Sequence, residues 1–405
     1  MPRNPETSIY RGDPSEVFAR DFIRRAPELD HYEEVAFERM VAPYFHDKPQ
    51  HTQLGRDFPP GAYKRGELES DYQEVLRLRD RDKKDDTERG RILEAFFGQQ
   101  AARLGWFGEN CRAVRTTEYD DRKNATDLVL VFNTGEGEPL YLAIDVTTAE
   151  NPATLNKKLN RLVEGIDTGN LTDLKYFCDE TGKGDKQPAL KQLRGLPRVV
   201  IGLTPEGVAA LSKDLAPYLA SGGKNTAAER ALRSHDIQSQ LLKDVKQQLE
   251  NEILRSVLRY IQLISEKDEA TLFNYRCEQL GPDNYNNVRA LLNLVHDGVL
   301  LEKTDEKLVG EFDKLLEGVP LLEELGKKFG ITYPLTEIVE KHSQIRNQLS
   351  LVLEKKEGSR VSPETRAQVR TLGLSRPAWL RTDRLGAEPF RKWLNRLPPG
   401  QPQAA

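Results

Sequence analysis

Cysteine is scarce in this chain of 405 residues, which contains only Cys111, Cys178 and Cys277, all far apart. This spacing excludes a disulfide framework and a cysteine-based zinc site, and it is typical of a reducing compartment. Residues 1–10 are polar and no run of about 20 apolar residues occurs, so we expect neither a signal peptide nor a membrane span. The sequence therefore predicts a soluble, cytoplasmic protein with no membrane partner.

An excess of positive charge is also absent. Lys and Arg number 60 against 64 Asp and Glu, and the formal net charge is −4. A uniformly basic coat for nucleic acid is therefore excluded, and any contact with nucleic acid must come from local patches. The length predicts two or three domains.

Changes of pattern along the chain divide it into four regions. Residues 1–86 are charged and mostly helical, 87–222 mix helices with strands, 223–357 are helical, and 358–405 form a basic, partly disordered tail. The second region predicts an α/β domain with helices on a central mixed sheet. The expected elements are a helix over 88–104, strands over 112–119, 127–132 and 141–148, a helix over 152–166, a strand over 197–203 and a helix over 204–219.

The most informative stretch is 126–147, where two apolar strands each carry an aspartate. Alternation places Ala143, Asp145 and Thr147 on one face of the second strand. An ionised aspartate in so apolar a strand is costly to bury unpaired, so Asp145 requires a metal, a cation or a cleft. The alternatives are that Asp145 faces solvent on an edge strand and that Asp127 caps a turn.

A third acidic residue lies on the helix before these strands. Glu94 is about 100° from Leu93 around that helix, at the border of its apolar stripe. It therefore either reaches into a neighbouring cleft or is an ordinary surface acid.

Gly90 and Glu94 on this helix, Asp127, and the run Asp145-Val146-Thr147 together resemble the PD-(D/E)xK nuclease superfamily, and in particular its archaeal Holliday-junction-resolvase branch. The resemblance covers about residues 87–222. It implies a restriction-endonuclease-like αβββαβ core and Mg²⁺- or Mn²⁺-dependent hydrolysis of phosphodiester bonds in DNA or RNA. It also implies that Asp127 and Asp145 bind the metal, with Glu94 as a direct or water-mediated third ligand.

The sequence departs from this family at Thr147, where the motif has lysine. A hydroxyl can orient a water molecule but brings no charge, and losing one such stabilising contact costs about 10²–10³ in rate. Members of the superfamily relocate this lysine to the following helix. Lys158 lies about 60° from Leu155, on the flank of that helix's apolar face, and is our candidate for the relocated charge. Lys123, just before Asp127, is a second one.

Other basic residues suit contact with nucleic acid, with DNA favoured over RNA. Lys157 is expected to point outward from the same helix as Lys158. With Arg161, these lysines form a basic helix face that is either simply solvated or able to grip a phosphate backbone. In the tail, Arg391 and Trp393 belong to a mixture of basic and aromatic residues, which suits phosphate contacts and base stacking. A simple docking tail explains the same mixture.

The helical region carries apolar stripes at 253–264 and 291–301 that we assign to a core. It leaves a homodimer or a protein partner possible. Two functions compete with the nuclease: a catalytically inactive nuclease-fold protein that binds nucleic acid, motivated by Thr147, and a helical scaffold for protein partners.

Overall fold

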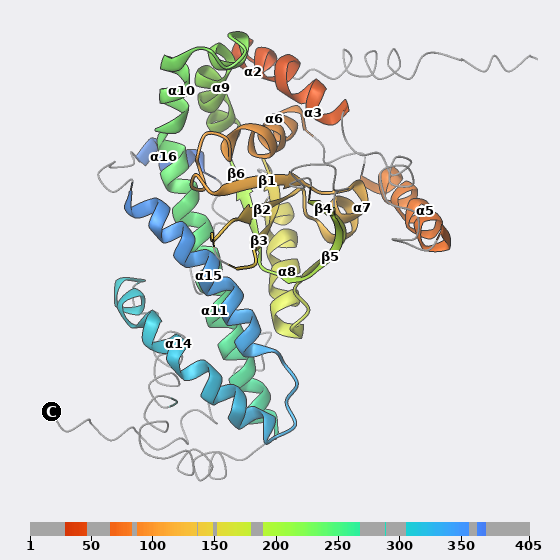
Figure 1. Ribbon diagram of the computed structural model, residues 1–405, viewed down its shortest axis with the longest axis vertical. Coiled ribbons are helices and arrows are strands. Elements are labelled where there is room, and N and C mark those ends of the chain that lie inside the picture. The colour runs from red at the N-terminus through yellow and green to blue at the C-terminus, as the bar shows by residue number, and fades with distance from the viewer. Residues whose placement is uncertain are drawn as a thin grey trace, which may run out of the picture.

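Four strands form the central sheet (Figure 1). This computed structural model describes residues 29–46, 65–82, 87–135, 137–148, 152–179, 189–267, 288, 305–355 and 363–369. The order across the sheet is β1 (Cys111–Arg115), β2 (Leu128–Phe132), β3 (Leu140–Thr147) and β6 (Arg198–Gly202). Strand β2 is antiparallel to β1 and β3, whereas β3 and β6 are parallel. The predicted class, a mixed sheet with helices, is therefore confirmed.

Both faces of the sheet are covered, because β2 is apolar on both sides. Leu128 and Leu130 belong to the largest hydrophobic core, whereas Val129 and Val131 belong to a smaller cluster on the opposite face. The large core is completed by α6 (Glu88–Phe96), the π-helical turn η2 (Phe97–Ala101) and α9 (Pro205–Ala220). The opposite face is covered by α8 (Pro152–Thr168) and by a hairpin of β4 (Thr172–Asp179) and β5 (Ala189–Leu196).

A long helix joins the sheet to the helical region (Figure 1). The helices concerned are α10 (Thr226–Arg233), α11 (Asp236–Lys267), α14 (Asp305–Lys327), α15 (Leu335–Glu354) and α16 (Pro363–Gln368). The first half of α11 packs in the large core, and its second half packs with α14 and α15 in a separate cluster. The stripe at 253–264 is thus buried, as expected of a core, whereas the stripe at 291–301 lies outside the described residues.

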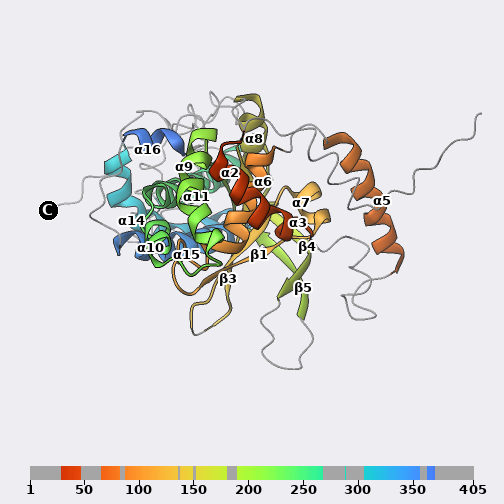
Figure 2. The same ribbon diagram turned by 90° about the horizontal axis from the view of Figure 1, so that it is seen from above.

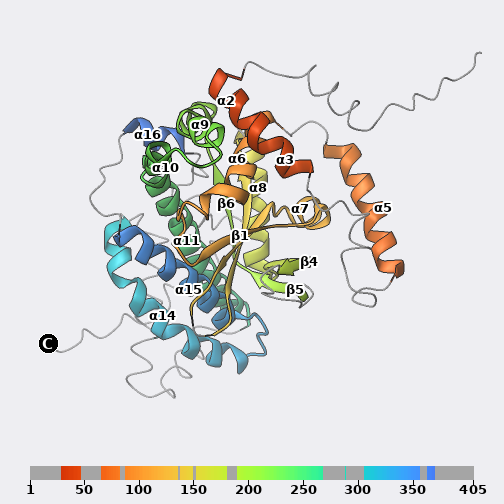
Figure 3. The same cartoon turned by 45° about the horizontal axis from the view of Figure 1, so that its top comes forward.

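The N-terminal helices are α2 (His31–Ala36), the π-helical turn η1 (Phe37–Val41), α3 (Ala42–His46) and α5 (Arg65–Asp82). Two of them, α2 and α3, lie at the end of the molecule far from α14 (Figure 3), and α5 stands apart at one side (Figures 2 and 3). Helix α2 contacts α9, and α5 contacts α7 (Glu118–Asn124). These contacts attach the charged N-terminal region to the α/β region.

Two expected elements require correction, and one hairpin was not expected. The strand expected over 112–119 ends at Arg115, because the Thr117 side chain accepts a hydrogen bond from the Asp120 N–H and begins α7. The helix expected over 88–104 ends at Phe96 and continues as a π-helical turn. The β4–β5 hairpin was not predicted; its Leu174 and Leu193 cover the face of the sheet opposite the large core.

No helix in the described part of the chain is both long enough and apolar enough to cross a membrane.

Candidate functional site

Asp127 and Asp145 lie side by side on one face of the sheet. Leu128 pairs with Ile144 in the antiparallel ladder, and the Asp127 N–H donates to the Ile144 carbonyl at 2.9 Å. Alternation from this register places both aspartates on the face that also carries Val129. The Asp127 carboxylate accepts a hydrogen bond from the Val146 N–H at 2.6 Å. Asp127 therefore bonds across two strands and does not cap a turn.

Asp145 does not face solvent on an edge strand. Strand β3 lies between β2 and β6, and Asp145 is only 4% exposed. Thr147, two residues further along the same face, is also buried. A buried carboxylate in this position requires a compensating positive charge.

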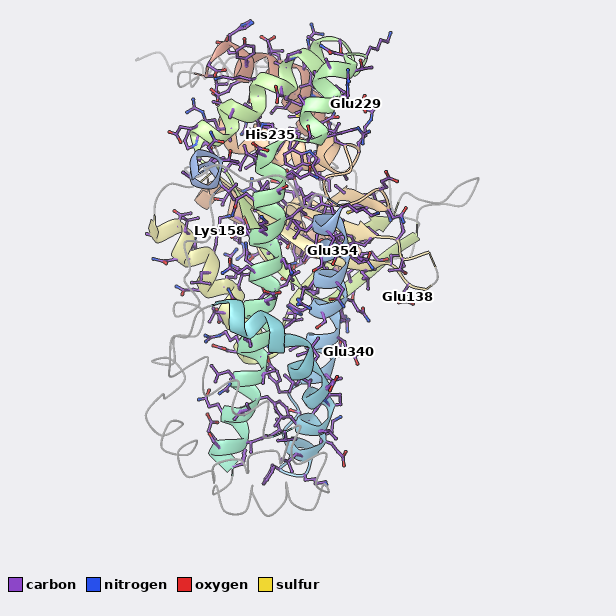
Figure 4. The ribbon with its side chains drawn as sticks, turned by 90° about the vertical axis from the view of Figure 1, so that its left-hand side faces the viewer. Glu138, Lys158, Glu229, His235, Glu340 and Glu354 are labelled. Atoms are coloured by element: carbon purple, nitrogen blue, oxygen red, sulfur yellow. The ribbon has the colours of Figure 1, made fainter. Side chains whose placement is uncertain are left out.

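Lys158 supplies that charge from α8, where Figure 4 labels it. Its ammonium donates to the Asp145 carboxylate, and the two side chains form an ion pair. Burial alone lowers the pKa of Lys158, but attraction by Asp145 and then by Asp127 outweighs it, so the pKa lies above its usual value. Lys158 is therefore a protonated cation at the aspartate pair.

The other basic candidates lie elsewhere. Lys157 and Arg161 are exposed on α8, as expected for the outward-facing side of the helix. Lys123 pairs with Glu74 of α5 at 3.2 Å and is about half exposed. Arg391 and Trp393 lie outside the described residues.

Glu94 reaches the same end of the sheet from α6. Its carboxylate lies 3.9 Å from the Arg115 guanidinium, and 14% of its side chain is exposed, so it is not an ordinary surface acid. Burial raises the pKa of Asp127 well above its usual value, and the negative charges of Asp121, Glu94 and Asp145 raise it further. Four carboxylates therefore act on one another here, opposed by Lys158.

Sequence reasoning missed two charged residues of this site, Asp121 and Arg198. Asp121 is on α7, which begins inside the strand expected over 112–119 and continues beyond it; the spacing of Thr117 and Asp120 is the capping signal that could have revealed the helix. Arg198 begins β6, opposite Ala143, and therefore shares the face of Asp145.

Arg198 also stabilises the turn that precedes β2. Its guanidinium donates to the Asn124 carbonyl at 2.8 Å, just before Ala125, which adopts a left-handed conformation with φ 51°. Non-glycine residues in this region are uncommon and strained, and such strain is frequent near functional sites. Arg198 thus fixes the turn that delivers Asp127.

The fit of a metal ion can be judged from these side chains. Within the described ranges, no three His, Cys, Asp or Glu side chains are placed to hold a metal ion. Mg²⁺, however, is usually bound through one or two carboxylates, with waters and substrate phosphates completing its shell. Asp127 and Asp145 suit such a two-carboxylate site, and a cation would relieve the repulsion that raises the Asp127 pKa. A metal held entirely by the protein does not fit.

Comparison with known proteins adds no relative: no family model, no curated protein and no solved structure matches this chain. The functional argument therefore depends on the arrangement of these side chains.

Proposed function

We propose that this protein is a metal-dependent nuclease that hydrolyses phosphodiester bonds in nucleic acid, with DNA favoured over RNA. The observation that carries this proposal is the aspartate pair on one face of neighbouring strands, with the protonated Lys158 against Asp145. The order α6, β1, β2, β3, α8, β6 supports a restriction-endonuclease-like core, into which α7 and the β4–β5 hairpin are inserted.

The proposed roles follow from position and charge. Asp127 and Asp145 hold Mg²⁺ or Mn²⁺, with Glu94 as a water-mediated third group. A bound ion of this kind lowers the pKa of a water molecule and neutralises charge on the phosphate. Lys158, kept protonated by its neighbours, stabilises the negative charge that develops on the phosphate. Thr147, on the same face, orients water through its hydroxyl.

We assign to Lys158 the positive charge that the motif lysine supplies and that Thr147 lacks. An ammonium from α8 acts on the same carboxylate that a lysine two residues after Asp145 would serve. The exposed Lys157 and Arg161 continue the positive charge along α8. We propose that they contact the phosphate backbone of the substrate. Such contacts position the nucleic acid but do not read its base sequence.

The test is cleavage of labelled DNA and RNA with Mg²⁺, with Mn²⁺ and with neither, by wild type, Asp145→Ala and Glu164→Gln. Glu164 is an exposed acid on α8 and serves as the matched control. We expect metal-dependent products from wild type and the control, and a loss of about 10²-fold or more in Asp145→Ala. Products that persist in Asp145→Ala would refute the assigned site.

A second candidate is a nuclease-fold protein that binds nucleic acid without cutting it. The lack of a three-residue metal set in the described ranges favours it. Salt-dependent binding by wild type, with no cleavage of any substrate under any metal, would select this candidate. A helical scaffold gains no such support, because the stripe at 253–264 is buried.

A further inference from the structure

A second polar cluster lies at the same end of the sheet, where α3, α6 and α7 gather (Figure 3). The Arg115 guanidinium, from β1, donates to the Tyr44 carbonyl of α3. It also stacks 4.0 Å from the centre of the Tyr44 ring and 4.8 Å from that of Phe45. Arg115 is therefore held between the N-terminal helices and the sheet.

The donors of this cluster exceed its acceptors. The structure gives no hydrogen-bond acceptor to the buried Nε and Nη2 of Arg115 or to the buried Tyr44 hydroxyl. The Glu94 carboxylate, 3.9 Å from Nη2, is too distant for a hydrogen bond. Buried polar groups are normally paired, and several unpaired donors together indicate an ion or ligand that accepts from them.

The Tyr44 hydroxyl is a donor at physiological pH. Burial raises its pKa well above the usual value, and the charges of Glu94 and Asp127 add to this, against the opposing effect of Arg115. The same interactions place the phenol within electrostatic range of the aspartate site. Arg115 keeps 12% of its side-chain surface, so the cluster is not sealed from solvent.

The backbone is unusual at this cluster. The turn η1 ends three residues before Tyr44, and η2 begins three residues after Glu94. Gly98 in η2 admits the Tyr44 ring, because a Cβ there would lie 2.7 Å from two ring carbons. Single π-helical turns occur frequently at functional sites.

We propose that Arg115 and Tyr44 form a phosphate-binding subsite for a substrate phosphate next to the one that is cut. Guanidinium groups match phosphate oxygens in geometry and charge, and a phenol adds one more donor. The inference rests on the proposed nuclease function, since Arg115 pairs across the ladder with Leu128, the residue next to Asp127. It assigns a role in substrate binding to residues of β1 and α3, which lie outside the acidic motif.

The experiment is calorimetric titration of the full chain, without metal, by three probes: inorganic phosphate, a dinucleotide with only its internal phosphodiester, and the same dinucleotide with a 5′-phosphate. The variants are Arg115→Met and Tyr44→Phe, with Arg103→Met as the control. Arg103 comes just after η2, and its side chain is exposed. We expect affinity to fall about tenfold or more in Arg115→Met and several-fold in Tyr44→Phe, with the control unchanged.

The probes separate the sources of the phosphate. Tighter binding of the 5′-phosphorylated dinucleotide assigns the subsite to a strand end, and equal binding of both dinucleotides assigns it to the backbone; either supports the proposal. Tyr44→Phe keeps the ring, so it remains informative should Arg115→Met fail to fold. Equal affinities in Arg115→Met and Arg103→Met, or no binding of any probe by wild type, would overturn the subsite.

The nuclease proposal and the subsite proposal can be refuted independently of each other. Loss of phosphate binding in Arg115→Met, combined with undiminished cleavage by Asp145→Ala, would leave the subsite in place and remove the assigned metal site. If cleavage requires Asp145 but its KM is the same in Arg115→Met and wild type, the assigned metal site stands and the subsite is refuted.

Discussion

Replacing Asp244 by asparagine should stabilise the protein relative to wild type, by an amount that grows as the pH rises. Asp244 lies on α11, is buried, and accepts a hydrogen bond from the Gln248 side chain at 2.8 Å. Gln248 in turn pairs with both the N–H and the carbonyl of Val200, at 2.9 and 2.8 Å, and so covers the edge of β6. Val200 pairs with Asp145 across the parallel ladder, so this contact supports the candidate site.

The magnitude follows from the pKa of Asp244, which burial raises from 3.8 to about 7. Below pH 3.8 the carboxyl is protonated in both the folded and the unfolded state. Between pH 3.8 and about 7 the unfolded state releases this proton while the folded state retains it, so the free energy of unfolding falls as the pH rises. About three pH units at about 1.4 kcal/mol each give a loss on the order of 4 kcal/mol. Above pH 7 the effect is complete.

Asparagine keeps the acceptor for Gln248 but does not titrate. We therefore expect the unfolding free energy of Asp244→Asn, measured relative to wild type by urea titration, to increase steadily between pH 4 and pH 7 and then to level off. Circular dichroism and tryptophan fluorescence should report the same change. The matched control is Glu340→Gln, an exposed acid on α15 (Figure 4). Parallel stability curves for Asp244→Asn and wild type across this range would refute the reasoning.

Two further variants test the contacts around the site. Lys158→Met should destabilise the protein by about 3–5 kcal/mol in urea unfolding, because it leaves Asp145 buried without its partner, and adding Asp145→Asn should restore much of the loss without restoring cleavage. If the double variant is no more stable than Lys158→Met alone, the ion pair does not have the assigned weight. Gly98→Ala should cost about 1–3 kcal/mol in the same assay, because the new Cβ overlaps the Tyr44 ring. An unchanged stability would show that the ring is not fixed against η2.

The central strands could be predicted because their sequences suit only a strand that is buried on both faces. Residues 128–132 are apolar at every position, as expected of a strand buried on both faces, and residues 140–147 are apolar except at Asp145 and Thr147. The β4–β5 hairpin could not be recognised in this way. Its strands include Lys175, Lys191 and Arg194, and only packing against the sheet decides their conformation.

The acidic part of the site was accessible to sequence reasoning, whereas its basic and aromatic parts were only partly so. Asp145 stands out because a charge within an apolar strand requires compensation, and helical geometry placed Lys158 on the correct flank of α8. Arg115 carries no comparable signal, since a charged residue near the end of a strand is ordinary. Its role depends on Tyr44, 71 residues earlier, and only the folded chain brings the two together.

The helical region is joined to the site through buried charge. On α11, Glu252 contacts His342 of α15 at 2.6 Å, and Glu250 contacts Arg346 at 2.9 Å; all four side chains are buried. Glu252 also interacts electrostatically with Arg198, which donates to the turn before Asp127. The change of sequence pattern at residue 222 therefore does not separate two independent cores, because α11 belongs to both. A shift of α15 along α11 would break the buried Glu250–Arg346 ion pair and the buried Glu252–His342 contact at a high free-energy cost, which fixes the register of the helices against the strand that supports the aspartates.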